Sequence, residues 1–253
     1  MAQKGHACRS RLNGSVGPCA SRSFCSSPRA PPRQPAPAAS PPAHAAAIAA
    51  RGELPLGLGE KRDGRVYVPA QPRAKYPVLL LLHGASGAGE RIERRLQGLA
   101  DQFGFIILAP DSRGISWDGR DGAFGPDVTF IDRALQDLFA RYPVDASHIA
   151  IGGFSDGASY ALSLGIINGD LFTHVIAFSP GFIAADYGYG KPPIFISHGT
   201  ADEILDIDHS SRVFVPALRR QGYRVQFRQF DGPHTIPPDV AKEAVRWWLI
   251  DKM

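Results

Sequence analysis

The chain has 253 residues, of which 28 are basic and 24 acidic, with a formal net charge of +4 at pH 7. The charge is unevenly placed, because residues 1–52 hold seven of the basic residues and no acid. The rest of the chain therefore has 21 basic and 24 acidic residues, a net charge of −3, which does not suit a nucleic-acid-binding surface. All three cysteines, Cys8, Cys19 and Cys25, lie in the same N-terminal segment, so the remainder has neither a disulfide nor a cysteine nucleophile.

Residues 1–52 are rich in Ser, Ala, Pro and Arg, and such a segment cannot bury enough apolar surface to offset the entropy of ordering. We therefore predict a disordered extension over 1–52 and one folded domain over 53–253. Arg- and Ser-rich segments without acids also resemble transit peptides. The expected location is the cytoplasm, or an organelle if the extension is a targeting signal. No run of 18 apolar residues occurs, so no transmembrane segment is expected.

Strand and helix patterns alternate along residues 53–253. Two strands, 54–60 and 65–69, are expected around the hairpin signal Asp63-Gly64. Continuous apolar runs typical of buried parallel strands follow at 78–82, 105–109, 148–151, 175–178 and 193–197, and an alternating edge strand at 224–230. Helical patterns lie between and after them, at 92–102, 128–142, 158–168, 210–221 and 238–252. This order predicts an α/β fold with a mostly parallel sheet and helices on both of its faces.

One serine lies where such a fold collects its chemistry. The run Gly-Phe-Ser-Asp-Gly at 153–157 follows the strand 148–151 and precedes a helix. A serine at this strand-turn-helix corner has an exposed hydroxyl, and the flanking glycines let strand and helix approach closely. Active-site residues of open sheets also collect at the carboxyl ends of the strands. Ser155 is therefore the predicted nucleophile.

A serine hydroxyl needs a base within hydrogen-bond distance, and the pKa of histidine suits this task. Three of the eight histidines follow strands at the carboxyl edge of the predicted sheet: His83, His198 and His234. The first two stand in His-Gly turns, where we expect them to shape the oxyanion loop and the turn that carries the acid. His234, in the loop after the last strand, is the predicted base.

The base in turn needs a carboxylate that fixes its tautomer and stabilises the imidazolium. Asp202 directly follows a core strand and is the predicted acid, with Asp206 and Asp208 as alternatives further along the same loop. Along the chain the nucleophile comes first, then the acid, then the base. About one strand-helix-strand unit lies between each of these residues and the next.

The oxyanion of a tetrahedral intermediate needs two backbone N–H donors. We expect one from Asp156, at the helix N-terminus, and one from Ala85, with the hydroxyl of Ser86 as an alternative donor. No cofactor is predicted, because residues 87–92 lack the third glycine of a dinucleotide loop and no phosphate-binding loop occurs. No metal site is predicted either, since the His and Asp residues at 198–209 lack a metal-binding spacing.

From Glu53 to the C-terminus these motifs resemble the α/β-hydrolase fold, and most of all the phospholipase/carboxylesterase group of small serine esterases. The resemblance implies Ser155 as nucleophile, Asp202 as acid and His234 as base. It is carried by Leu82-His83-Gly84, Gly153-Phe154-Ser155-Asp156-Gly157, Ala177-Phe178-Ser179-Pro180-Gly181, His198-Gly199-Thr200-Ala201-Asp202 and Gly232-Pro233-His234-Thr235-Ile236-Pro237.

Some features bear on the substrate. Acyl-protein thioesterases of this group usually have glutamine after the nucleophile and then a further glycine, whereas Asp156 and Ala158 stand here. The stretches 124–131 and 140–145 are similar to feruloyl-esterase and polyester-depolymerase relatives. The segment 180–192 is too short for a helical cap domain, so we expect an open site. Aromatic candidates to line it are Trp117, Phe124, Phe182, Tyr187 and Tyr189.

The sequence thus predicts a serine carboxylic-ester hydrolase that acts through an acyl-enzyme on a small-molecule ester with a small acyl or aryl group. Alternatives on the same triad are an acyl-thioesterase, a feruloyl esterase, a peptidase or an acyltransferase. A non-catalytic relative that binds a ligand in the pocket is the alternative of another class. The sequence does not determine the oligomeric state.

Overall fold

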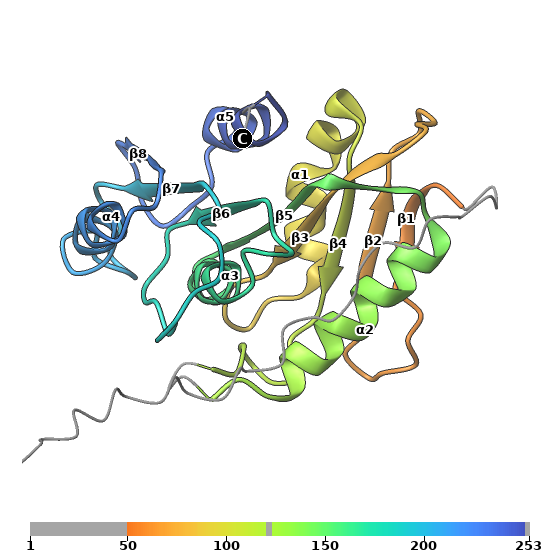
Figure 1. Ribbon diagram of the computed structural model, residues 1–253, viewed down its shortest axis with the longest axis horizontal. Coiled ribbons are helices and arrows are strands. Elements are labelled where there is room, and N and C mark those ends of the chain that lie inside the picture. Colours follow the sequence, from red (N-terminus) through yellow and green to blue (C-terminus); the bar gives the residue numbers. More distant parts are fainter. Residues whose placement is uncertain (1–49, 120–122, 251–253) are drawn as a thin grey trace, which may run out of the picture. The chain divides into compact units, whose positions relative to one another are not determined.

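The computed structural model describes residues 50–119 and 123–250, and the predictions for residues 1–49 lie outside them. Eight strands form one sheet in the order β1-β2-β4-β3-β5-β6-β7-β8 (Figure 1). Only β1 with β2 and β2 with β4 pair antiparallel, and the other neighbours pair in parallel. The mostly parallel sheet expected from the sequence is confirmed, with β8 at one edge. The strands are β1 (Gly52–Pro55), β2 (Gly64–Val68), β3 (Tyr76–Leu82), β4 (Ile106–Pro110), β5 (Val144–Phe154), β6 (His174–Phe178), β7 (Ile194–Gly199) and β8 (Val225–Phe230).

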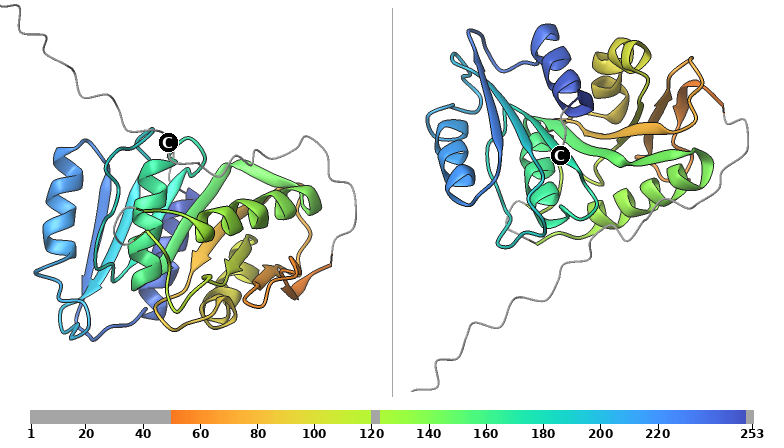
Figure 2. Two further views of the ribbon diagram at one scale, coloured as in Figure 1. Left: turned by 90° about the horizontal axis from the view of Figure 1, so that it is seen from below. Right: turned by 45° about the horizontal axis from the view of Figure 1, so that its top comes forward.

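Helices cover both faces of the sheet, as predicted (Figures 1 and 2). Successive side chains of a strand point to opposite faces, so the apolar run of β3 serves two cores. Leu79 and Leu81 pack in the core that contains Trp248 of α5, whereas Leu80 and Leu82 pack in the core beneath α2 and α3. The helices are α1 (Gly89–Phe103), α2 (Pro126–Arg141), α3 (Asp156–Ile167), α4 (Ser211–Arg220) and α5 (Pro238–Ile250).

The first hairpin differs from the prediction in its turn. Its strands pair antiparallel as expected, but β1 already ends at Pro55 and residues 56–63 form a wide loop. The carboxylate of Asp63 accepts hydrogen bonds from the amides of Gly57 and Leu58, at 3.1 and 3.0 Å. A side chain that caps backbone amides in this way holds a longer loop, so Asp63-Gly64 is not a two-residue turn.

Contacts of the folded chain begin before residue 53. The hydroxyl of Tyr142 donates to the carbonyl of Ala50 at 2.8 Å, and the guanidinium of Arg51 lies 3.0 Å from the hydroxyl of Tyr76. The domain boundary at residue 53 stays a prediction, and these contacts place residues 50–52 with the sheet.

The connection between β6 and β7 bears on access to the site. Residues 179–193 contain no helix, so the structure has no large cap domain at this point, as expected from the length of the segment. None of the helices within 50–119 and 123–250 is long and apolar enough to cross a membrane.

Candidate active site

Ser155 stands at the corner between β5 and α3, with φ 57° and ψ −122°. Its amide donates to the carbonyl of Phe178 on the neighbouring strand at 2.9 Å, which fixes the corner against β6. Both flanking positions require glycine, because a side chain there would collide with the backbone. A Cβ at Gly153 would lie 2.3 Å from the carbonyl oxygen of Gly157, and one at Gly157 would lie 2.3 Å from that of Leu82. The strand-turn-helix corner expected from the sequence is therefore present, and Ser155 is half-buried on it.

The predicted base and acid lie together at the same edge of the sheet. Nδ1 of His234 is 2.6 Å from Oδ2 of Asp202, although the two residues are 32 positions apart. The imidazole also packs against Phe154, the residue before the serine, with ring centroids 4.6 Å apart and the ring planes tilted by 35°. Because Nδ1 faces the carboxylate, it carries the proton, and Nε2 is the atom left to act as base.

The environment of Asp202 suits a charged carboxylate. Burial acts to raise the pKa of this carboxyl, but hydrogen bonds from the amide of Leu205 and from His234 outweigh it, so the pKa lies below its ordinary value. The two alternative acids face other partners. Asp206 pairs with His209 at 2.8 Å and Asp208 with Arg212 at 2.7 Å, both on the exposed side of the loop.

The loop after β3, residues 83–87, carries the predicted oxyanion donor Ala85 and is called the oxyanion loop; it lies against the nucleophile. A Cβ built on Gly84 would meet Cβ of Ser155 at 3.2 Å. His83 shapes this loop as expected. Its Nε2 accepts from the amide of Ser112 at 3.0 Å and its Nδ1 donates to the carbonyl of Gly84 at 2.7 Å. Burial lowers the pKa of His83. The ring is therefore neutral, and its two hydrogen bonds hold the loop in place.

The backbone amides around Ser155 bear on the predicted oxyanion donors. The amide of Ser86 is already bonded to the carbonyl of Ile115 at 2.7 Å. Within the described part of the chain, no acceptor faces the amide of Ala85 or that of Asp156. This pattern supports Ala85 and Asp156 as the two donors, which stay a prediction.

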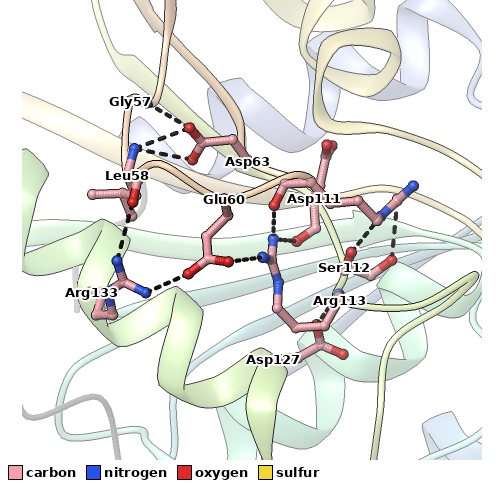
Figure 3. Close-up of polar contacts among 10 residues, drawn as sticks. Gly57, Leu58, Glu60, Asp63, Asp111, Ser112, Arg113, Asp127 and Arg133 are labelled. Atoms are coloured by element: carbon pink, nitrogen blue, oxygen red, sulfur yellow. Dashed lines mark hydrogen bonds and ion pairs between the residues drawn. The ribbon is translucent and has the colours of Figure 1, made fainter.

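A polar network joins the β1–β2 loop, the loop that follows β4, and α2 (Figure 3). The guanidinium of Arg113 lies 3.8 Å from the carboxylate of Glu60, donates to the carbonyls of Arg62 and Asp111, and stacks over the ring of Phe130 at 3.5 Å. The network thus ties the β1–β2 loop to the start of the β4–α2 loop.

Arg62 extends this network to the site. Its Nε donates to the carbonyl of Ser112 at 2.6 Å and its terminal nitrogen to the carbonyl of Gly87 at 3.0 Å. Trp117, on the same β4–α2 loop, donates from Nε1 to the carbonyl of His83 at 2.7 Å. The oxyanion loop is therefore fastened from two other loops. The sequence reasoning missed Arg62, because nothing in its neighbours signals contacts so far along the chain.

Asp156 has a partner that the sequence did not suggest. Its Oδ2 accepts a hydrogen bond from the hydroxyl of Ser116 at 2.8 Å. The half-buried carboxylate thus lies at the N-terminus of α3, next to the nucleophile, and is held by the β4–α2 loop.

The aromatic candidates occupy different places. Trp117 is 7% exposed and stacks on Tyr160 with centroids 5.4 Å apart, and Phe124 also packs on Tyr160, at 5.5 Å. Their contacts are therefore mainly structural. Phe182 is half-buried at the first turns of α3, where its amide bonds to the hydroxyl of Ser159 at 3.2 Å.

Tyr187 and Tyr189 lie elsewhere. The amide of Tyr189 bonds to the carbonyl of Ile166 at 3.1 Å, and Gly188 lies against the same carbonyl. This is the C-terminal end of α3, roughly 15 Å along the helix axis from its start at 1.5 Å per residue. The placement argues against the prediction that Tyr187 lines the site, because the segment after Phe182 runs along α3 away from the serine.

Within residues 50–119 and 123–250, no three His, Cys, Asp or Glu side chains are grouped to hold a metal ion. The arrangement of the site is one for proton transfer and nucleophilic attack by side chains. That no cofactor takes part stays a prediction.

A mostly parallel sheet with a strained serine between β5 and α3, and a histidine–aspartate pair at the ends of β7 and β8, defines an α/β-hydrolase. Comparison with known proteins agrees. Residues 128–246 match the model of the phospholipase/carboxylesterase family. The chain thus has the α/β-hydrolase fold, and over these residues it is similar to the phospholipase/carboxylesterase family.

The relatives include proteins named as esterases. The chain is 29% identical over 198 residues to feruloyl esterase B of Neurospora crassa, covering 72% of this chain and 67% of that protein. It is 26% identical over 144 residues to the poly(3-hydroxybutyrate) depolymerase of Ralstonia pickettii, covering 48% of this chain but only 29% of the depolymerase. Fluorophosphonate-binding serine hydrolase F of Staphylococcus aureus has the same fold, with a TM-score of 0.63 at 16% identity over 80% of this chain and 99% of that one.

Proposed function

We propose that the protein is a serine hydrolase of carboxylic esters that acts through an acyl-enzyme. The observation that carries this proposal is the 2.6 Å contact between His234 and Asp202, with the imidazole packed against the residue before Ser155. A buried carboxylate that orients a histidine beside a strained serine is the arrangement that activates a hydroxyl.

In the first half of the reaction Ser155 Oγ attacks the ester carbonyl while Nε2 of His234 takes its proton. The imidazolium is stabilised by Asp202, and the oxyanion is bound by the amides of Ala85 and Asp156. Collapse of the tetrahedral intermediate breaks the bond to the alcohol, which leaves with the proton from His234. In the second half, water gives a proton to His234, attacks the acyl carbon and releases the acid, and the proton returns to Ser155.

The proposed substrates are small acyl or aryl esters. Three observations support this class: the relatives named for feruloyl and polyester substrates, the absence of a helix between β6 and β7, and the half-buried position of Ser155. A site without a cap admits an ester group carried on a larger molecule.

The test is reaction of the purified protein with a fluorophosphonate probe, followed by mapping of the labelled residue by mass spectrometry. We expect labelling at Ser155 only. Ser155→Ala should abolish labelling and lower kcat on an aryl ester by about 10⁴-fold.

Two outcomes would count against the proposal. Protein that is folded by circular dichroism but unlabelled would favour a ligand-binding relative without activity. Turnover of a matched amide faster than of the ester would favour a peptidase. His209→Gln serves as the control, because this exposed histidine pairs only with Asp206 and should leave labelling unchanged.

A further inference from the structure

A second histidine contacts the acid of the site. Nε2 of His198 lies 3.2 Å from Oδ2 of Asp202, the same oxygen that His234 contacts at 2.6 Å. The side chains of His198 and Asp202 are both fully buried, whereas that of His234 is 14% exposed. The other oxygen, Oδ1, accepts from the amides of Ile204 and Leu205 at 3.0 and 2.9 Å. The carboxylate thus has two imidazole neighbours on one oxygen and two amides on the other.

The contacts of His198 define its tautomer. Nε2 is 2.7 Å from the carbonyl of Leu205, which can only accept, so Nε2 carries the proton. The same nitrogen lies 3.2 Å from Oδ2 of Asp202. Nδ1 then accepts from the hydroxyl of Ser211 at 2.7 Å. Burial lowers the pKa of His198 despite the carboxylate beside it. His198 is therefore a neutral ring whose protonated Nε2 bonds to Leu205 and lies beside the acid, and the proton-transfer steps above do not use it.

We propose that His198 is a positioning residue that fixes Oδ2 of Asp202 and, by sharing its charge, sets the basicity of His234. The proposal rests on the proposed function, since it assigns His198 a task in the same triad. The positive end of an N–H dipole beside a carboxylate stabilises its negative charge and weakens its pull on a neighbouring cation. With His198 in place, the imidazolium of His234 is therefore stabilised less than it would be beside Asp202 alone.

The charged groups with the largest effect on this pair belong to the site itself. They are Asp202 and His234 for His198, and His234 for Asp202. The neighbour of His198 on α4 is the uncharged Ser211, and its partner in the sheet is Gln229 of β8. A change at His198 therefore reaches the base through Asp202.

The experiment measures the rate at which the fluorophosphonate probe labels Ser155 as a function of pH, because this rate requires the neutral form of His234. His198→Phe keeps a planar ring but removes the donor. We expect its labelling curve to move to higher pH by about half a unit to one unit. His198→Gln offers an amide N–H near the position of Nε2 and should restore most of the shift. His209→Gln is the exposed control and should leave the curve in place.

The outcomes separate the two proposals. If the wild-type protein is not labelled, the proposed function fails. If wild type is labelled and the His198→Phe curve coincides with it, or moves to lower pH, the role of His198 is overturned while the proposed function stands.

A measurement on wild type covers the case in which His198→Phe does not fold. Nitrogen-15 NMR of the histidine rings should show His198 neutral, with its proton on Nε2, between about pH 5.5 and pH 8. A proton on Nδ1 of His198, or protonation of both of its nitrogens within this range, would overturn the inference.

Discussion

At the scale of the residue, strained backbone conformations lie around the site. Within the described ranges the non-glycine residues with positive φ are Ser86, Ser155 and Ser179, at 57°, 57° and 53°. Each follows a strand at the carboxyl edge of the sheet, in the oxyanion loop, at the nucleophile and after β6. Such a backbone costs about 1–3 kcal/mol per residue and persists only where the surroundings fix it. The amides of all three are held by carbonyls of Ile115, Phe178 and Ser197.

The acid gives the first prediction at this scale. Asp202→Asn should lower kcat of ester hydrolysis by about 10³- to 10⁴-fold, because an amide can hold His234 in the wrong tautomer and does not stabilise the imidazolium. Steady-state kinetics on an aryl ester measures the loss. Asp206→Asn is the matched control, since Asp206 faces His209 and solvent. A comparable loss in the control would assign the acid to Asp206.

Asp156 gives a second prediction. Its carboxylate stands beside the nucleophile, so an ester with an anionic acyl group should be disfavoured relative to a neutral one. Asp156→Asn keeps the shape and an acceptor for Ser116. We expect kcat/KM for a hemisuccinate ester to rise about three- to tenfold relative to a neutral ester, as expected for charges several ångströms apart near a surface.

Salt provides the control for this prediction. Discrimination in the wild type should shrink between 0.01 and 1 M NaCl, since screening shortens the range of the repulsion. An unchanged substrate ratio in Asp156→Asn would mean that the carboxylate points away from the acyl site.

At the scale of the element, the β4–α2 loop supports the oxyanion loop through hydrogen bonds. Ser112, Ile115 and Trp117 each bond to residues of the loop after β3. The amide of Gly89, at the start of α1, bonds to the carboxylate of Asp111 at 2.7 Å. The oxyanion loop thus owes its shape to a segment that follows the next strand along the chain.

Arg62 provides the prediction for this scale. Arg62→Gln removes the guanidinium that joins Gly87 to Ser112, so the oxyanion loop should lose its fixed position. An oxyanion forms only during the reaction, and kcat should therefore fall about tenfold with KM nearly unchanged. Steady-state kinetics on an aryl ester measures kcat and KM separately, and circular dichroism verifies folding.

Arg133→Gln is the control for the Arg62 variant. Arg133 belongs to the same network, through Glu60 and the carbonyl of Leu58 (Figure 3), and within the described residues no hydrogen bond or ion pair joins it to the oxyanion loop. A change in KM instead of kcat in Arg62→Gln would place the effect on substrate binding and contradict the assignment.

At the scale of the whole described domain, two buried histidines link stability to pH. Burial lowers the pKa of both His83 and His198. Below about pH 6.5 these two histidines bind protons in the unfolded chain but remain neutral in the folded state. Stability is therefore complete above this pH and falls as the pH drops through it, by up to about 1.4 kcal/mol per pH unit for each ring.

Urea unfolding at pH 7.5 and pH 5.5 measures this dependence. The fall in the unfolding free energy between the two pH values should be smaller in His198→Phe than in wild type. His209→Gln should behave as wild type, because that side chain is 86% exposed. Equal pH dependence in wild type and His198→Phe would show that His198 binds its proton in the folded state.

The sequence by itself determined the class of fold and the strand ends that carry the site. Apolar runs, helical periods and the Gly-x-Ser-x-Gly corner are local patterns, because they record what each segment buries and where the chain turns. They also led to Ser155, Asp202 and His234, since each follows a strand whose carboxyl end must face the same edge. The close contact of His234 with Asp202 agrees with that reasoning.

Only the tertiary structure decided what depends on distant partners. Arg62 meets Gly87 and Ser112, and His198 meets the acid and Ser211, through contacts that no local pattern records. Tyr187, an aromatic on a loop near the site in sequence, lies instead toward the far end of α3. Local preference sets which elements form, but a side chain's role follows from which elements pack beside it, and packing is fixed by the whole chain at once.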